Sequence, residues 1–143
     1  MILLDTNLLA RMTNSKHPQC MVSRRALSVL SGRGEQLVIV PQDLYEFWAV
    51  ATRPLGQAPQ GQNGLDMTIS QASQWTQFFQ RRFTLLPDRA DLVDHRTHGV
   101  RGFRCHDARF VAAMQTHGIS RLLTFNGADF KQFPITIVDP TSV

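Results

Sequence analysis

The sequence predicts a three-layer α/β/α fold with a central, mostly parallel sheet of four to five strands. Segments typical of strands and of helices alternate from one end of the chain to the other, which favours a parallel α/β sheet. The strand candidates are short, continuous apolar runs, as expected of strands that are covered on both faces. With 143 residues the chain has the commonest size of one domain, and we expect a single domain over residues 1–143.

Ten segments carry the signals of strands or helices. The expected strands cover residues 2–4, 37–40, 83–86, 122–124 and 135–138. The expected helices cover residues 21–30, 42–52, 68–82, 88–97 and 107–116. Pro41 suits the first turn of a helix and Gly118 suits a helix C-terminal cap, so both support this order of elements.

Residues 53–64 are rich in glycine, proline and polar side chains, which indicates a long surface loop. One interpretation is a plain connector between two helices. The other is a mobile edge beside an active site, because long loops in compact domains are often functional.

The charge balance favours a polyanionic partner. The formal net charge is +4 and the sequence pI is about 9.8, and such a balance attracts nucleic acid through counterion release. All of the 15 basic residues except Lys16 and Lys131 are arginines, whose planar guanidinium suits phosphate recognition. A codon-usage bias toward arginine is the alternative explanation.

Neither membrane insertion nor secretion is expected from the sequence. No apolar run approaches the ~18 residues that a membrane-spanning helix needs. The first residues lack the basic leader of a secretion signal. Cys20 and Cys105 are too few and too scattered for a disulfide framework, so we expect a cytoplasmic protein.

Four acidic residues are candidates for a functional site. Asp5 comes directly after the first apolar strand, at the edge where open α/β sheets bind ligands. Asp107 and Asp129 stand in later segments, and any of these three aspartates could instead be a local helix cap. Glu46 lies in the most apolar helix pattern, where a carboxylate either faces the packed side and needs a partner or points outward to water.

Asp5, Asp107 and the loop at residues 126–129 would meet at one edge of the sheet if the first and fourth strands were adjacent, so that three carboxylates would crowd together. At about 4 Å and an effective dielectric constant of about 20, each pair of like charges costs about 4 kcal/mol, so the three pairs together would cost a large share of the stability of a small domain. A divalent cation would remove this conflict. Oxygen ligands, with no Cys₄ or Cys₂His₂ spacing, favour Mg²⁺ or, as a substitute, Mn²⁺.

A metal centre of this kind can hydrolyse a phosphodiester bond. One or two cations lower the pKa of a bound water, orient it for in-line attack and neutralise the departing oxygen. We expect Asp5 and Asp107 to be the principal ligands, and Glu46 to bind a second metal or to orient the water. Either Asn126 or Asp129 is expected to help through water.

Two hydroxyl groups and three guanidinium groups flank these acidic residues in the sequence. Thr6 and Thr124 are expected to hold the carboxylates through hydrogen bonds. The arginines around Asp107 either grip phosphate groups or form a solvated face: Arg101, Arg104 and Arg109.

Two further groups of residues have spacings that invite a functional interpretation. The first is a loose cluster whose spacing matches no closed zinc site, so that roles at the surface or at helix ends are expected: His95, His98, Cys105 and His106. The second recurs at helical spacing and is expected to form core or a dimer face rather than a base-stacking platform: Trp75, Phe78, Phe79 and Phe83.

Four motifs in this order resemble the PIN-domain family, and within it the VapC-type toxins of bacterial toxin–antitoxin pairs. The opening strand motif is matched by LLDTNLL at residues 3–9, and the glutamate helix by YEFWAVATRP at residues 45–54. HDAR at residues 106–109 and LTFNGADF at residues 123–130 complete the series, which spans nearly the whole chain.

The resemblance implies a Mg²⁺-dependent endoribonuclease, usually a homodimer, that a cognate antitoxin silences by covering the acidic site. It carries metal-site roles onto Asp5, Glu46 and Asp107. At the fourth position some members have an acidic residue where this chain has Asn126, and others use the position that matches Asp129. The assignment of the fourth position therefore stays open between these two residues.

Two other functions are compatible with parts of the sequence. A non-catalytic PIN-like module for binding RNA or protein would keep the fold and the basic surface without turnover, because a fold does not guarantee an activity. A flavodoxin-like phospho-acceptor could use Asp5, although Glu46 inside an apolar helix has no place in that scheme.

Overall fold

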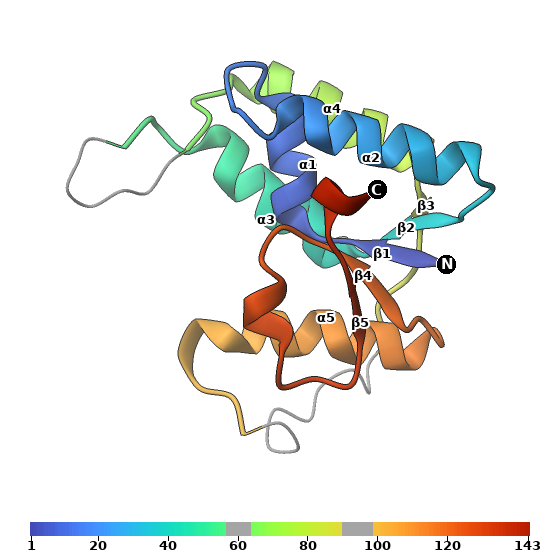
Figure 1. The fold of residues 1–143 in the computed structure, drawn as a ribbon. Helices are drawn as coiled ribbons and strands as arrows, with labels where there is room; N and C mark the ends of the chain where they lie inside the picture. The colour runs from blue at the N-terminus through green and yellow to red at the C-terminus, as the bar shows by residue number, and fades with distance from the viewer. Residues whose placement is uncertain (57–63, 90–98) are drawn as a thin grey trace.

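Within residues 1–56, 64–89 and 99–143, which the computed structural model describes, five parallel strands form one central sheet (Figure 1). The strands are β1 (Ile2–Leu4), β2 (Leu37–Ile39), β3 (Thr84–Leu85), β4 (Arg121–Leu123) and β5 (Thr136–Val138). Their order across the sheet is β3-β2-β1-β4-β5. The prediction of a parallel α/β sheet is confirmed, and the first and fourth strands are adjacent, as the convergence of the carboxylates requires.

Helices cover both faces of this sheet. The α-helices are α1 (Thr6–Thr13), α2 (Cys20–Gly32), α3 (Pro41–Thr52), α4 (Ile69–Arg82) and α5 (Cys105–Thr116). Short 3₁₀ turns are η1 (Gly102–Arg104), η2 (Gly127–Phe130) and η3 (Pro140–Ser142). In Figure 1 the helices α1 to α4 lie on one face of the sheet and α5 lies on the other, which confirms the three-layer α/β/α architecture.

Two helices differ from the sequence-based expectation. Helix α1 was not predicted, and it begins directly after β1 because the Asp5 side chain caps it by accepting a hydrogen bond from the backbone N–H of Asn7. The helix expected at 88–97 falls mainly outside the described residues, and Asp88 and Arg89 are not helical. Most of the loop at 53–64, from residue 57 to residue 63, also lies outside them.

The proline and the glycine expected at helix ends occupy those positions. Pro41 occupies the first turn of α3, where its missing N–H costs no helical hydrogen bond. Gly118 follows α5 with a φ of +66°, a left-handed conformation that glycine adopts without a steric cost. The chain can therefore turn there from α5 toward β4.

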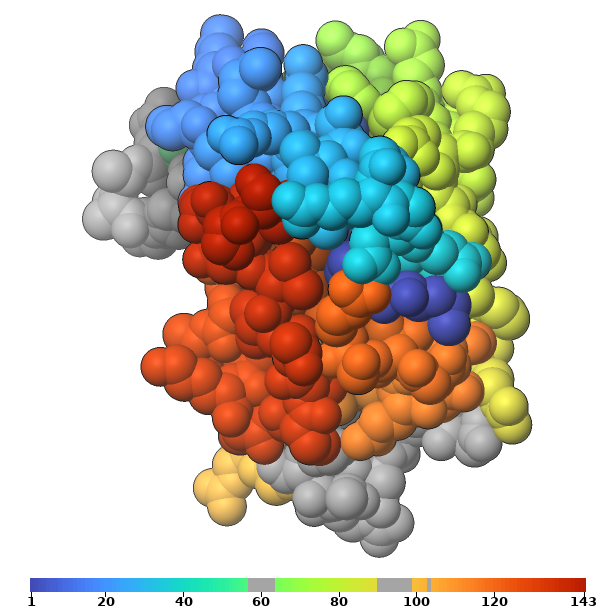
Figure 2. Space-filling view, turned by 45° about the vertical axis from the view of Figure 1, so that its right-hand side comes forward, coloured from blue at the N-terminus to red at the C-terminus, as the bar shows by residue number. Residues whose placement is uncertain are grey.

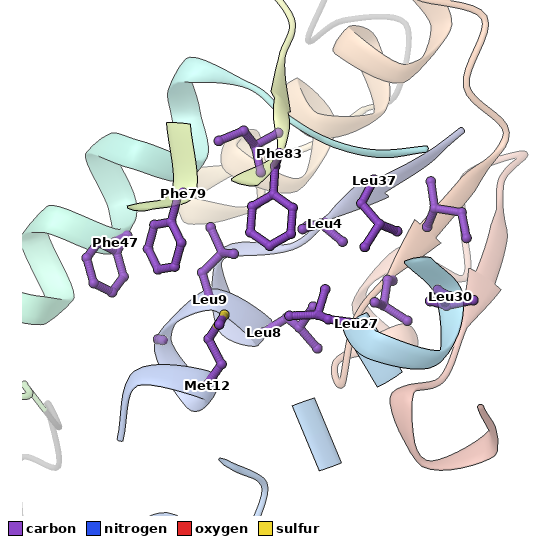
Figure 3. Close-up of a cluster of buried hydrophobic side chains, with 14 of the residues drawn as sticks. Leu4, Leu8, Leu9, Met12, Leu27, Leu30, Leu37, Phe47, Phe79 and Phe83 are labelled. Carbon is purple, nitrogen blue, oxygen red and sulfur yellow. The ribbon is translucent and has the colours of Figure 1, made fainter. Parts of the chain in front are cut away.

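Alternate residues of the strands point into two separate hydrophobic layers. Leu4 and its neighbours in register pack against α1 to α4, whereas Leu3 packs against α5. Figure 3 shows the first of these layers, where leucines from β1, β2, α1 and α2 meet Phe47, Phe79 and Phe83. Phe79 and Phe83 are thus core residues as predicted, while Phe78 remains 37% exposed.

The C-terminal turn closes the molecule on the side of α2. Helix α2 contacts η3, and Figure 2 shows the red C-terminal residues lying against the light blue and cyan surface of α2. Among the described residues, the helices are all too short or too polar to span a lipid bilayer.

Candidate active site

A cavity at the carboxyl edge of the sheet gathers the predicted acidic residues. The strand order reverses at β1, between β2 and β4, and open α/β sheets bind ligands at such a switch point. The cavity has a volume of about 570 Å³. Its lining contains the four acidic residues expected from the sequence and both candidates for the fourth position: Asp5, Glu46, Asp107, Asn126 and Asp129.

Asp5 is both a helix cap and a member of this cavity. Its carboxylate accepts hydrogen bonds from the backbone N–H of Asn7 at 3.2 Å, from Asn7 Nδ2 at 2.8 Å and from Thr124 Oγ1 at 2.5 Å. Thr124 follows β4, so this last hydrogen bond ties the ends of two adjacent strands together. Asp5 therefore caps α1 and lines the cavity at the same time, so its capping role does not exclude a role in the site.

The Asp5 carboxylate lies in an environment that disfavours its charge. Its pKa is raised to about 6, chiefly by burial and also by the negative charges of Glu46 and Asp107, against the lowering effect of the hydrogen bonds from Thr124 and Asn7. Its hydrogen-bond donors are neutral groups. A cation in the cavity would stabilise the ionised form of Asp5 directly.

Glu46 projects from α3 into the same cavity and is held by hydrogen bonds on both of its oxygens. Thr6 Oγ1 donates to Oε2 at 2.9 Å, and Gln42 Nε2 donates to Oε1 at 2.8 Å. His106 Nδ1 lies 3.1 Å from Oε1 as well. The Glu46 side chain is 28% exposed, so it faces the cavity rather than open solvent, and its orientation is fixed before any ligand binds.

Asp107 and Asp129 approach the cavity from its other side. Asp107 lies in the first turn of α5, and partial burial raises its pKa, with the charges of Asp129 and Glu46 adding to the effect. Arg104 and His106 partly offset this shift. Negative charge is thus shared across α3, α5 and η2 rather than confined to one element.

Solved structures of the same architecture identify the fold. The chain matches FitAcB from Neisseria gonorrhoeae over 100% of both chains, with 14% identity and a TM-score of 0.67. It matches VapBC2 from Rickettsia felis, bound to a promoter DNA fragment, over 96% of this chain and 98% of that one, with 18% identity and a TM-score of 0.65. For the sarcin–ricin loop cleaving toxin VapC20 from Mycobacterium tuberculosis the coverages are 94% and 98%, the identity 16% and the TM-score 0.61. The chain has a PIN-like fold. No protein-family model and no curated sequence matches it significantly.

Two buried side chains that hydrogen-bond residues of the cavity were not singled out from the sequence. Asp43 is fully buried, accepts a hydrogen bond from the Val40 N–H at 2.8 Å and lies 3.3 Å from Thr6 Oγ1. Burial raises its pKa well above the usual range, and the charges of Asp5 and Glu46 contribute. An acidic residue two positions after a helix-opening proline is a signal that could have indicated this capping role.

Gln42 is the second missed residue, and it links two elements of the site. Its Nε2 donates to Glu46 on the next turn of α3 and also, at 2.9 Å, to the carbonyl oxygen of His106 at the start of α5. The residue is 4% exposed. Because His106 precedes Asp107, the Gln42 side chain links the Glu46 carboxylate to the helix turn that carries Asp107.

The basic residues that line the cavity are not the ones proposed from the sequence. Arg109 forms an ion pair with Asp88, and neither Arg101 nor Arg104 is among the described residues that line the cavity. The guanidinium groups that do line it come from α1 and from the end of α3: Arg11 and Arg53.

The donor set of the cavity suits Mg²⁺ better than zinc. In the part of the chain that the structure describes, no three His, Cys, Asp or Glu side chains are arranged to hold an ion by themselves, while His95 and His98 lie outside that part. Mg²⁺ does not need such a cage, because it keeps several waters and binds through one or two carboxylates together with substrate phosphates. Buried Asp5, with neutral donors and raised pKa, meets that requirement.

Proposed function

We propose that the chain is a Mg²⁺-dependent endoribonuclease that acts as the toxin of a type II toxin–antitoxin system. The observation that carries this proposal is the cavity at the sheet's switch point, which four carboxylates from separate elements line. The PIN-like fold supports it, because VapC20, a toxin that cleaves the sarcin–ricin loop, shares that fold. The net charge of +4 suits an RNA substrate.

The residues of the cavity have distinct roles in this proposal. Asp5 and Asp107 are the principal ligands of Mg²⁺ or Mn²⁺, and Glu46 orients the attacking water or binds a second ion. When bound, the ion supplies an acidified water and positive charge for the departing oxygen. Thr124 holds Asp5 and Thr6 holds Glu46, so that both carboxylates keep their orientation while substrate enters.

The function can be tested with purified chain that carries no partner protein. We expect cleavage of RNA in Mg²⁺ or Mn²⁺, no cleavage in EDTA, and loss of cleavage in Asp107→Asn. Asp139→Asn is the matched control, since Asp139 caps η3, away from the cavity, and asparagine caps equally well. Cleavage that continues in EDTA or in Asp107→Asn would contradict the proposal, and RNA binding without any turnover would favour the non-catalytic alternative.

Gln42→Met should weaken metal binding without unfolding the protein. Methionine has a similar volume but cannot donate to Glu46 or to the His106 carbonyl, so Glu46 loses its orientation. We expect the Mn²⁺ concentration for half-maximal binding to rise about 10- to 100-fold, as for other partners of metal ligands. Isothermal titration calorimetry measures this, with exposed Gln80→Met as control, and equal affinities of the two variants would contradict the role of Gln42.

The proposal includes two protein partners, a cognate antitoxin and a second copy of the chain. The resemblance in sequence motifs supports both, and VapBC2 shares the fold. Apolar surface for such contacts is present at a groove between α1, α2 and α4 that Met12, Trp75 and Phe78 line. Light scattering of the purified chain should give twice its mass of 16.2 kDa, and a monomer at all concentrations would contradict the homodimer.

A further inference from the structure

The cavity has a basic end that the proposed metal chemistry does not use. Arg11, in the last turn of α1, and Arg53, the C-cap residue of α3, line it together with the carboxylates. Neither guanidinium has a hydrogen bond or an ion pair with any described residue, and Nε of Arg11 is buried without a partner. Two cations therefore face a cavity rich in carboxylates and remain unpaired.

The separation of acidic and basic groups follows from the helices. Arg53 is seven residues after Glu46, so both lie on one face of α3, about 10 Å apart along its axis. Arg11 lies six residues after Asp5, about 9 Å along α1. Each helix thus presents a carboxylate to the cavity and a guanidinium about two turns farther along.

The carboxylates do not neutralise these guanidinium groups. The pKa of Asp5 is lowered only by its hydrogen bonds with Thr124 and Asn7, and no arginine contributes. The pKa of Asp107 is lowered by Arg104 and by His106, again without Arg11 or Arg53. The positive charge at this end of the cavity is available to a ligand.

Backbone contacts fix the position of Arg53. The N–H of Asp66 donates to the Arg53 carbonyl at 3.0 Å, and Gly64 packs so closely that a Cβ there would lie 1.9 Å from that carbonyl oxygen. Only glycine allows this approach. The backbone of Arg53 at the end of α3 is therefore held in place by its contacts with residues 64 and 66.

We propose that Arg11 and Arg53 form a phosphate-binding subsite that holds the RNA backbone a few nucleotides from the bond that is cut. Four carboxylates repel the phosphates of RNA. An RNA strand can therefore enter the cavity only if nearby positive charge compensates for this repulsion. Guanidinium groups bind phosphate with two parallel hydrogen bonds, which fixes the register of the strand as well as attracting it. The choice of RNA as the ligand rests on the proposed function.

RNA binding, measured without cleavage, tests the subsite. We would titrate a labelled single-stranded RNA of about 12 nucleotides with Asp107→Asn protein in EDTA, by fluorescence anisotropy at several salt concentrations. Adding Arg11→Gln or Arg53→Gln should weaken binding about fivefold or more at low salt. Each should also reduce the slope of log Kd against log salt by about 0.7, the value for one phosphate contact on a single strand. Arginine-to-lysine changes should restore the slope but only part of the affinity.

The control is Arg25→Gln, which removes the same charge from an exposed site on α2. Equal slopes for Arg25→Gln and the two cavity variants would overturn the inference, and circular dichroism melting would verify that all three variants fold. Because no cleavage is measured, the two proposals fail separately. A chain that binds RNA through Arg11 and Arg53 but never cuts it would refute the ribonuclease and keep the subsite.

Discussion

Asp5→Asn is expected to abolish cleavage and at the same time to stabilise the metal-free protein. Loss of a principal ligand removes several kcal/mol of transition-state stabilisation, and about 4 kcal/mol corresponds to a roughly 10³-fold lower kcat. The gain in stability has another origin, since the carboxylate is buried next to Glu46 and Asp107. The single substitution should therefore lower kcat and raise the free energy of unfolding, which shows that the ionised Asp5 carboxylate serves catalysis and destabilises the metal-free fold.

The sign of the stability effect follows from the pKa of Asp5. The folded value of about 6 lies above the unfolded value of about 4, so the folded state holds the proton more tightly and loses stability as the pH rises from about 4 to about 6. At pH 7 this penalty is about 3 kcal/mol. Asparagine removes the penalty but cannot accept every hydrogen bond from Asn7 and Thr124, which costs about 1 kcal/mol, so a net gain of about 2 kcal/mol is expected.

Urea unfolding of both proteins between pH 4 and pH 8 measures this difference. The advantage of Asp5→Asn should grow between pH 4 and pH 6 and then stay constant, whereas Mg²⁺ should stabilise the wild-type chain alone. Asp43→Asn is the matched control, because Asp43 is also buried with a raised pKa but does not line the cavity. It should gain stability as well and keep kcat within about tenfold. A pH-independent difference for Asp5→Asn would contradict the role assigned to its burial.

The sheet and the acidic site were predictable because their signals are local and their geometry is general. Short apolar runs mark strands such as β1 and β4, and parallel neighbours bring their carboxyl ends to one edge. Asp5 follows β1 directly and Asn126 follows β4 within three residues, so adjacency of the two strands was enough to place them together. Glu46 was conspicuous because a carboxylate is rare in so apolar a helix.

Helix α1 was missed because its own sequence is a weak helix former. Thr6, Asn7 and Thr13 favour caps and turns in isolation, and eight residues are too few for a helix that is stable without packing. The helix exists because Asp5 caps it and because Leu8 and its neighbours are buried against α2 and α3. Missing α1 also hid Arg11, whose position on the cavity depends on that helix.

Gln42 and Asp43 were missed for a different reason. Both look like ordinary polar residues of a helix start, and only tertiary packing shows that they are almost completely buried. The contact of Gln42 with the carbonyl of His106 joins positions 64 residues apart. No periodicity in the sequence encodes such a pairing, whereas the spacing of four residues between Gln42 and Glu46 was visible.

Phe79→Ala should cause the largest loss of stability among single substitutions in the layer of core beside α4. The ring is fully buried, meets Phe47 edge-on with centroids 4.8 Å apart and stacks on Trp75 and Phe83. Removing a buried phenylalanine costs about 3–5 kcal/mol, a large part of the 5–15 kcal/mol that holds a domain together. For a chain of this size we expect the melting temperature to fall by roughly 15 °C.

The same substitution should disturb the site, because Phe47 directly follows Glu46 in α3. A void in place of the Phe79 ring lets Phe47 move, and the Glu46 carboxylate then loses its alignment with Thr6. Calorimetry and RNA cleavage at 10 °C, where the variant is still folded, would measure the two effects separately. Gln80→Ala is the control from the same helix, since that side chain is exposed and its loss should cost less than about 1 kcal/mol. Equal losses in the two variants would show that the packing against Phe47 does not support α3.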